Sequence, residues 1–166
     1  PVPETVDVLI AGSGPAGLSL AAQLARVPQI RTMLVEPKPG PMEKGQADGI
    51  SVRSMEMFQA FGFAEKVKRE SVWINETTFW APGSGSALAR VARVQDVPDG
   101  SSEMPHVLIN QARVHDMFLD LMRQSPSRLE PDYGLKVATL VVDPAATEYP
   151  VTVTLEHTAP GREGQT

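Results

Sequence analysis

A glycine-rich turn near the start of the chain, Gly12-Ser13-Gly14-Pro15-Ala16-Gly17, constrains the possible folds more than any other feature. It follows an apolar run over residues 6–11 and precedes a segment over 15–26 that has the composition of a helix. A second apolar run over 30–36 then ends at the acid Glu36. This order of strand, glycine turn, helix, strand and acid is typical of a βαβ unit that binds a dinucleotide.

Each residue type in the turn suits that interpretation. Gly12 permits a sharp turn out of the first strand, and Gly14 lets the backbone approach a pyrophosphate without a Cβ in the way. Gly17 allows the helix to pack closely on the strand. Pro15 suits the first helical turn, where its missing N–H would have no intrahelical partner.

The acid at the end of the second strand indicates which dinucleotide would bind. Glu36 is placed to accept hydrogen bonds from an adenosine ribose, and an acid there disfavours a 2′-phosphate. The site therefore suits FAD or NAD better than NADP. The alternative is a glycine-rich structural turn followed by a surface glutamate.

Composition limits the class of protein. A chain of 166 residues is long enough for one domain with a real core. A net charge of −5 argues against nucleic acid or an anionic membrane as the main partner. Absence of cysteine excludes a disulfide framework and thiolate metal sites, and no metal-ligand spacing is present. The sequence shows no membrane-spanning stretch and no secretory signal, so a cytoplasmic location is the default expectation.

The remaining pattern predicts an α/β fold. After the first βαβ unit, the expected helices are a capped one that ends at Gly62, a short one, and one capped by Asn110. A strand rich in aromatic residues and its return strand predict a hairpin. The predicted ranges are helices 52–61, 64–70 and 111–124, and strands 72–80, 88–95, 106–110, 135–142 and 150–157.

A doubly wound sheet needs later parallel strands to complete the crevice in which its ligand lies. No segment after residue 157 can supply them. We therefore expect the chain to be the N-terminal, truncated part of a larger fold.

A second informative segment is the loop Gly45-Gln46-Ala47-Asp48-Gly49-Ile50. Its glycines permit close approach to a ligand, although Asp48 considered alone is a turn residue or a helix-flanking acid. Together with the glycine turn, Glu36 and the segment 108–113, this loop resembles the flavin-dependent aromatic hydroxylases. The resemblance is greatest to the branch of phenol 2-monooxygenase and 3-hydroxybenzoate 4-monooxygenase, and it covers nearly the whole chain.

The resemblance implies an FAD site with NADPH as transient reductant and a small aromatic substrate. A homodimer of the full-length protein is a further expectation. Asp48 would match the family's general base, which takes the proton of a phenolic hydroxyl. Residues Gly12 to Gly17 would hold the pyrophosphate and Glu36 the ribose, with Pro37 and Lys38 beside it. The residues that would line the flavin are Gly45, Gln46, Ala47, Gly49 and Gln111.

Several weaker predictions concern single side chains. His106 is either a ligand for a substrate carboxylate or a polar residue at a strand end. Trp73, Phe79 and Trp80 are interpreted as core residues, with a substrate-facing sheet as the alternative. His115 is expected to be solvated, and Met55, Met57, Met117 and Met122 are expected to fill the core.

These observations predict a Rossmann-like FAD-binding domain over 1–166, incomplete, with 72–97 starting an antiparallel substrate-domain sheet. The implied function is an FAD-dependent phenol-type monooxygenase, represented by a portion that is inactive alone. Two alternatives stay open: a non-catalytic dinucleotide-binding remnant, and an NAD-dependent oxidoreductase, which gives the 45–50 loop no role.

Overall fold

The computed structural model describes residues 2–85 and 87–158. It divides into two compact units, one formed by residues 1–43 with 115–166 and the other by residues 44–114. The helix α4 (Gln111–Arg123) crosses this boundary in sequence. Within the described ranges, no helix is long and apolar enough to cross a membrane.

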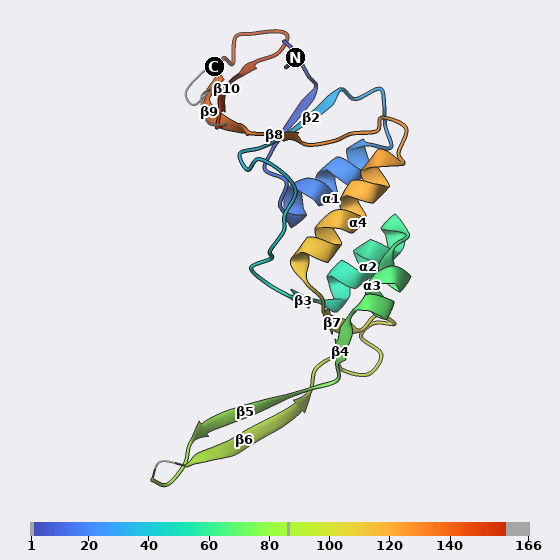
Figure 1. The fold of residues 1–166 in the computed structure, drawn as a ribbon, viewed down its shortest axis with the longest axis vertical. Helices are drawn as coiled ribbons and strands as arrows, with labels where there is room; N and C mark the ends of the chain where they lie inside the picture. The colour runs from blue at the N-terminus through green and yellow to red at the C-terminus, as the bar shows by residue number, and fades with distance from the viewer. Residues whose placement is uncertain (1, 86, 159–166) are drawn as a thin grey trace. The chain divides into compact units, whose positions relative to one another are not determined.

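The first unit contains the predicted βαβ motif. Strands β1 (Val8–Ala11) and β2 (Thr32–Glu36) pair in parallel, and α1 (Pro15–Leu24) connects them (Figure 1). A short third strand, β8 (Asp132–Tyr133), pairs with β2 in parallel and gives the sheet order β1-β2-β8. This arrangement confirms the α/β prediction and leaves β1 at an edge of the described sheet.

Apolar residues on both faces of β2 explain why this sheet is covered on both sides. Met33, Leu34 and Val35 are each at most 5% exposed, as expected for a parallel strand between two layers. One layer contains α1 and the C-terminal part of α4. The buried apolar side chains of those helical segments are Leu18, Ala21, Ala22, Met117, Phe118, Leu119 and Met122.

The other layer is the antiparallel pair β9 (Leu135–Val142) and β10 (Val151–His157). Leu135 joins Met33 and Val35 in one buried apolar cluster. Val151 is 48% exposed, because the outer ends of the two strands extend beyond that cluster.

The second unit has two helices and a small sheet. The helices α2 (Val52–Phe61) and α3 (Ala64–Glu70) begin and end as predicted. They pack around a stacked group of phenylalanines, in which the Phe58 and Phe63 ring centroids are 4.8 Å apart. Asn110 caps α4 as predicted, because its Oδ1 accepts the Ala112 N–H at 2.8 Å. Ser51 stands at the N-terminal cap position of α2, but its side chain makes no capping hydrogen bond.

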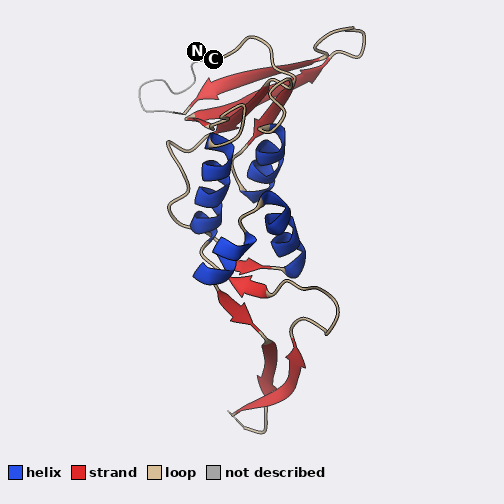
Figure 2. Ribbon diagram, turned by 90° about the vertical axis from the view of Figure 1, so that its right-hand side faces the viewer, coloured by secondary structure: helices blue, strands red, loops and turns tan. Residues whose placement is uncertain are grey.

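The sheet of this unit has the order β3-β7-β4, and Figure 2 shows its short strands below the helices. Its members are β3 (Gly49–Ile50), β7 (His106–Leu108) and β4 (Val72–Ile74), all antiparallel. The two-residue strands β3 and β8 were missed by the sequence prediction, because neither is long enough to show a period. The predicted strand 72–80 is interrupted at Asn75, between β4 and β5 (Glu76–Pro82).

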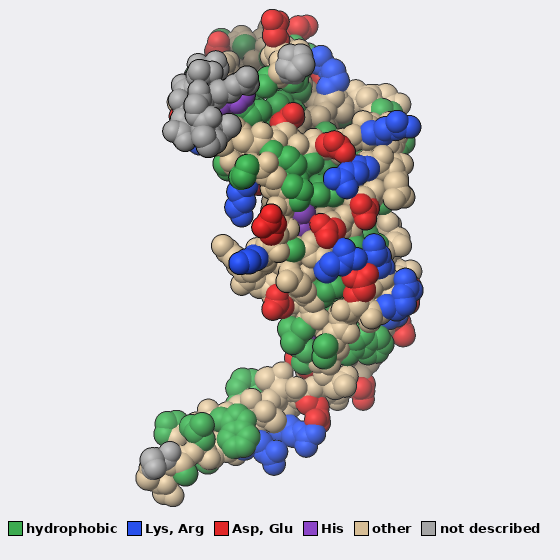
Figure 3. All heavy atoms as spheres, in the orientation of Figure 1, with side chains coloured by type: hydrophobic (Ala, Val, Ile, Leu, Met, Phe, Trp, Pro, Cys, Tyr) green, Lys and Arg blue, Asp and Glu red, His purple; other side chains and the backbone are tan. Residues whose placement is uncertain are grey.

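Strand β5 pairs with β6 (Leu88–Gln95) in the predicted hairpin. The interpretation of the aromatic residues of β4 and β5 as core is wrong for the part of the chain that the structure describes. Trp73, Phe79 and Trp80 are 49%, 51% and 58% exposed, and Figure 3 shows apolar side chains along the surface of this hairpin. A two-stranded ribbon has no second layer against which it could bury them.

Candidate functional site

The glycine turn Gly12 to Gly17, the predicted phosphate turn, has the backbone geometry that a phosphate-binding turn requires. Gly12 has φ +99°, a conformation that favours glycine, and its N–H donates to the Val35 carbonyl at 2.7 Å. Gly14 is the N-terminal cap of α1, and Pro15 is the first helical residue. The first α-helical hydrogen bond runs from Leu18 N to Gly14 O, so the preceding N–H groups have no intrahelical partner. They lie at the positive end of the helix dipole, where an anion is stabilised.

The space around the other two glycines tests whether this turn fits a diphosphate. A Cβ on Gly17 would lie 2.0 Å from the Gly12 carbonyl oxygen, so the helix packs on the turn through backbone alone. A Cβ on Gly14 would meet no described atom within 4 Å. The absence of a side chain at Gly14 therefore has no packing purpose in the protein itself. It leaves open space at the helix N-terminus, which is the shape that a phosphate group needs.

Glu36 lies directly against this turn. Its Oε2 accepts hydrogen bonds from the Ser13 N–H and the Ser13 hydroxyl, each at 2.9 Å, and its Oε1 accepts the Lys38 N–H at 3.1 Å. Burial of the carboxylate raises its pKa. The hydrogen bonds and the Lys38 charge together lower the pKa by more than burial raises it, so the pKa lies below its usual value. Glu36 is therefore an ionised acceptor, only 9% exposed, at the place predicted for a ribose.

The segment after Glu36 is held by hydrogen bonds to two of its backbone carbonyls. The Pro37 carbonyl accepts the Thr158 hydroxyl at 2.6 Å, and the Lys38 carbonyl accepts the Gly134 N–H at 3.0 Å. Both predicted neighbours of the ribose are thus held by the β9–β10 pair and the turn before it. The structure brings Gly12 to Gly17, Glu36, Pro37 and Lys38 together within one unit.

The second group of predicted residues lies in the unit of residues 44–114. Gly45 packs against Gln111, because a Cβ at Gly45 would lie 2.4 Å from the Gln111 Cβ. The Gln111 Oε1 accepts the Gln46 N–H at 2.9 Å. Gln111 thus touches two consecutive residues of the loop, and it stands at the first position of α4 as the sequence predicts.

Asp48 occupies the end of this loop, next to β3. Its backbone carbonyl accepts the Ile109 N–H at 2.9 Å and so extends the pairing of β3 with β7. Ala47, Asp48 and Gly49 are exposed. Among the described residues, the Asp48 carboxylate has no hydrogen-bond or ion-pair partner, so it is available to a ligand.

His106 has a defined orientation at the first residue of β7. Its Nδ1 lies 2.6 Å from Asp96 Oδ2, and Thr77 donates a hydrogen bond to Asp96 Oδ1 at 3.1 Å. A Cβ on Gly49 would lie 3.6 Å from the His106 Nε2, so the free ring nitrogen faces the residue after Asp48. Asp96 was missed by the sequence prediction, because no motif or periodicity distinguishes a lone acid ten residues before a histidine.

His115 corrects a prediction. It was expected to be solvated, but it is 3% exposed. A helical signal was available in the sequence, because positions 111, 115, 118 and 122 form one face of α4, and Phe118 and Met122 on that face are buried. The prediction for the methionines is confirmed at Met55, Met117 and Met122, while Met57 is only partly buried.

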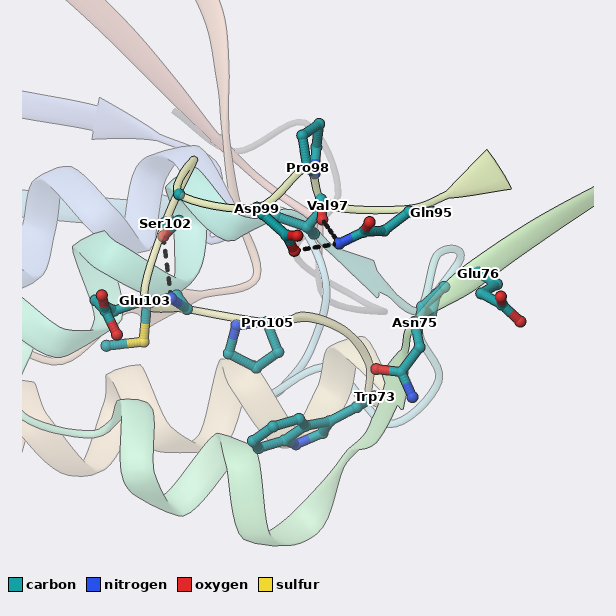
Figure 4. Close-up of a pocket in the computed structure, with 13 residues that line it drawn as sticks. Trp73, Asn75, Glu76, Gln95, Val97, Pro98, Asp99, Ser102, Glu103 and Pro105 are labelled. Atoms are coloured by element: carbon teal, nitrogen blue, oxygen red, sulfur yellow. Dashed lines mark hydrogen bonds between the residues drawn. The ribbon is translucent and has the colours of Figure 1, made fainter. Parts of the chain in front are cut away.

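A separate cavity of about 540 Å³ opens in the same unit as Asp48 (Figure 4). Trp73, Asn75, Met104 and Pro105 are among its lining residues. The hydrogen bonds drawn there, from Gln95 to Val97 O and Asp99 and from Met104 N to Ser102, are internal to its wall. None of the residues predicted to bind flavin lines this cavity.

Residues 5–156 match the family described as FAD binding domain. The chain belongs to this family. FAD is accordingly the cofactor of this domain, and the resemblance to flavin-dependent aromatic hydroxylases is confirmed.

The similar proteins are oxygenases. A 3-hydroxybenzoate 4-monooxygenase of Comamonas testosteroni is 58% identical over 166 residues, which cover 99% of this chain and 26% of that protein. The FAD-dependent monooxygenase terD of Aspergillus terreus is 42% identical over 154 residues, which cover 89% of this chain and 25% of that protein. The chain thus spans about a quarter of the length of the relatives it matches.

Solved structures support the same fold. The flavin-dependent monooxygenase PieE, solved with FAD and substrate, superposes with a TM-score of 0.75 at 23% identity over 98% of this chain and 29% of its own. The p-nitrophenol 4-monooxygenase PnpA of Pseudomonas putida superposes with a TM-score of 0.72 at 20% identity, over 92% of this chain and 36% of its own.

Proposed function

We propose that the protein is an FAD-dependent monooxygenase that hydroxylates a phenolic substrate with NADPH and O₂. The observation that carries this proposal is the phosphate turn bonded to a buried, ionised Glu36 in a chain 58% identical to a 3-hydroxybenzoate 4-monooxygenase. One oxygen atom would enter the ring and the other would leave as water, with two electrons from NADPH.

The first unit supplies the residues that would hold the adenosine half of FAD. The open helix N-terminus at Gly14 suits the pyrophosphate, and the remaining lone pairs of Glu36 suit the ribose hydroxyls. Gly45, Gln46, Ala47, Gly49 and Gln111 would line the flavin. FAD, when bound, supplies the redox chemistry that activates oxygen.

Asp48 is the proposed general base. Its carboxylate has no partner in the described chain and can therefore accept the proton of a phenolic hydroxyl, which makes the ring a better nucleophile. A positioned base of this kind contributes roughly 10²–10⁴-fold to the rate. His106, held by Asp96 with its Nε2 toward Gly49, is the proposed ligand for an anionic substituent of the substrate.

The segment 72–97 is proposed as the start of a substrate-side sheet. Its hairpin has an apolar surface with Phe79 and Trp80 more than half exposed, and it pairs with no other described strand. Such a surface suits further sheet that would face an aromatic substrate. A homodimer of the whole protein and a cytoplasmic location are further proposals that accompany this one.

The test is made on the protein with any sequence that follows Thr166 in its gene. We expect a yellow preparation that oxidises NADPH faster when 3-hydroxybenzoate is added and that forms a dihydroxylated product. A colourless preparation whose NADPH oxidation does not change when phenols are added would favour a non-catalytic nucleotide-binding protein. For residues 1–166 alone we expect weak or no retention of FAD.

A further inference from the structure

His115 is a buried titratable group that the proposed function does not use. It lies on α4, one helical turn after Gln111, and it belongs to the same unit as the phosphate turn. Only 3% of the residue is exposed, and histidine is seldom buried to this extent without a specific partner. Its surroundings therefore call for a functional explanation.

The contacts of the ring define its protonation state. The Met42 N–H donates a long hydrogen bond of 3.4 Å to the His115 Nε2, so this nitrogen is an acceptor. In a neutral imidazole the other nitrogen, Nδ1, then carries the proton. This Nδ1 is buried and has no hydrogen-bond partner among the described residues.

The groups that act on the ring are those of the predicted adenosine site. Burial lowers the pKa of His115 most, and the nearby Lys38 charge lowers it too. Asp116, Glu36 and the Ser13 backbone raise it, but burial prevails, so the pKa lies below the usual value. The ring is therefore neutral at neutral pH, and its environment includes both the phosphate turn and the segment after Glu36.

We propose that His115 is a positioning residue of the flavin site, which links the segment after Glu36 to the phosphate turn. The Nε2 accepts the Met42 N–H at 3.4 Å, and the Ser13 backbone lies close enough to the ring to raise its pKa. The N–H and hydroxyl of Ser13 in turn bind Glu36. The buried ring is therefore in reach of both segments between which the adenosine half of FAD would lie. This inference rests on the proposed function for the identity of the ligand.

The experiment compares three variants of the protein, again with any sequence that follows Thr166. His115→Leu removes both ring nitrogens, whereas His115→Gln keeps an acceptor and a donor. Leu119→Ala is the control, because Leu119 is an apolar residue that is equally buried on the same helix. The measurements are the FAD dissociation constant, amide hydrogen exchange at Ser13 and Met42, and the ¹⁵N shifts of the His115 ring.

We expect His115→Leu to weaken FAD binding by about tenfold, the effect of one lost buried hydrogen-bonding partner, and to speed exchange at both amides. His115→Gln should restore most of the affinity, and Leu119→Ala should lower thermal stability without changing the dissociation constant. The ¹⁵N shifts should show a neutral ring protonated at Nδ1.

Wild-type affinity in His115→Leu, unchanged exchange at both amides, or a ring protonated at Nε2 would each overturn the inference. A wild-type protein that binds no FAD would instead refute the proposed function. The exchange and ¹⁵N measurements would still decide the role of His115 in that case, because neither needs the cofactor.

Discussion

The two groups of predicted cofactor residues are held in very different ways. The phosphate turn is fixed by backbone contact between Gly12 and Gly17 and by a buried carboxylate that accepts three hydrogen bonds. The 45–50 loop is exposed along most of its length and is held by Gln111, by a backbone hydrogen bond from Ile109 and, at its end, by the pairing of β3 with β7. The turn is preorganised by the chain itself, whereas the loop presents the Asp48 carboxylate, the proposed general base, to solvent.

This difference fits the tasks that we propose for the two regions. A diphosphate is bound by N–H groups that must already point in the right direction, so rigidity at the turn improves affinity. A general base must meet a substrate that enters and leaves, and loops supply such groups. Mutations in the turn should therefore act on folding and cofactor affinity, whereas mutations in the loop should act on the rate.

The largest effect is expected at Asp48. Asp48→Ala should lower the rate of hydroxylation at neutral pH by roughly 10²–10⁴-fold, because the proton acceptor is lost. FAD content and the unfolding midpoint should stay near their wild-type values, since the side chain is exposed and unpartnered. Product formation in single turnovers measures the rate. Equal activity of the variant would remove Asp48 from the mechanism.

The next effect distinguishes two glycines of the turn. Gly17→Ala should cost about 3 kcal/mol of unfolding free energy, because its Cβ would lie 2.0 Å from a backbone oxygen. Gly14→Ala is the matched control, and its Cβ meets nothing within 4 Å. It should leave stability nearly unchanged but weaken FAD binding. Urea denaturation and FAD titration separate the two outcomes, and similar stability of both variants would contradict the packing argument.

A third prediction concerns acid stability. The pKa of Glu36 is lowered on folding, so its contribution to stability is present above its ordinary pKa of 4.5 and is lost as the pH falls through the folded value. Glu36→Gln should lower the free energy of unfolding by about 2 kcal/mol at pH 7, since the NH₂ group of the new amide would face one of the N–H or O–H donors that the carboxylate accepts. The difference from wild type should shrink on acidification. Denaturation curves across this pH range test it, and parallel pH profiles would refute it.

The smallest effect is expected at Gln111. Gln111→Ala removes the acceptor of the Gln46 N–H and should cost about 0.5–1.5 kcal/mol. It should also broaden the loop resonances in NMR spectra while those of the phosphate turn stay unchanged. Changes confined to the phosphate turn would show that the two regions are not held independently.

The sequence was most informative where a local rule determines the structure. The βαβ unit, the end of α2 at Gly62 and the cap at Asn110 were predictable, because turn and capping chemistry depend on neighbours in the chain. The prediction that Gln111 lines the flavin came from the family resemblance, and its observed contacts with Gly45 and Gln46 were not predicted. Asp48 and the other proposed roles remain predictions.

Long-range features were harder to predict. The contact of His115 with Met42 and the pairing of Asp96 with His106 depend on the tertiary fold, which no periodicity encodes. The aromatic residues of 72–80 were misjudged for a related reason. Their composition indicates that they need to be covered, but it does not indicate which segment covers them.

The exposed hairpin has a practical consequence for handling residues 1–166 alone. A ribbon with Phe79, Trp80, Leu88 and Val91 on its surface is a template for association between copies. Charges such as the Glu76–Arg93 ion pair counteract that tendency at low ionic strength. Aggregation of the isolated polypeptide should therefore begin at β5 and β6 and become faster as salt is added.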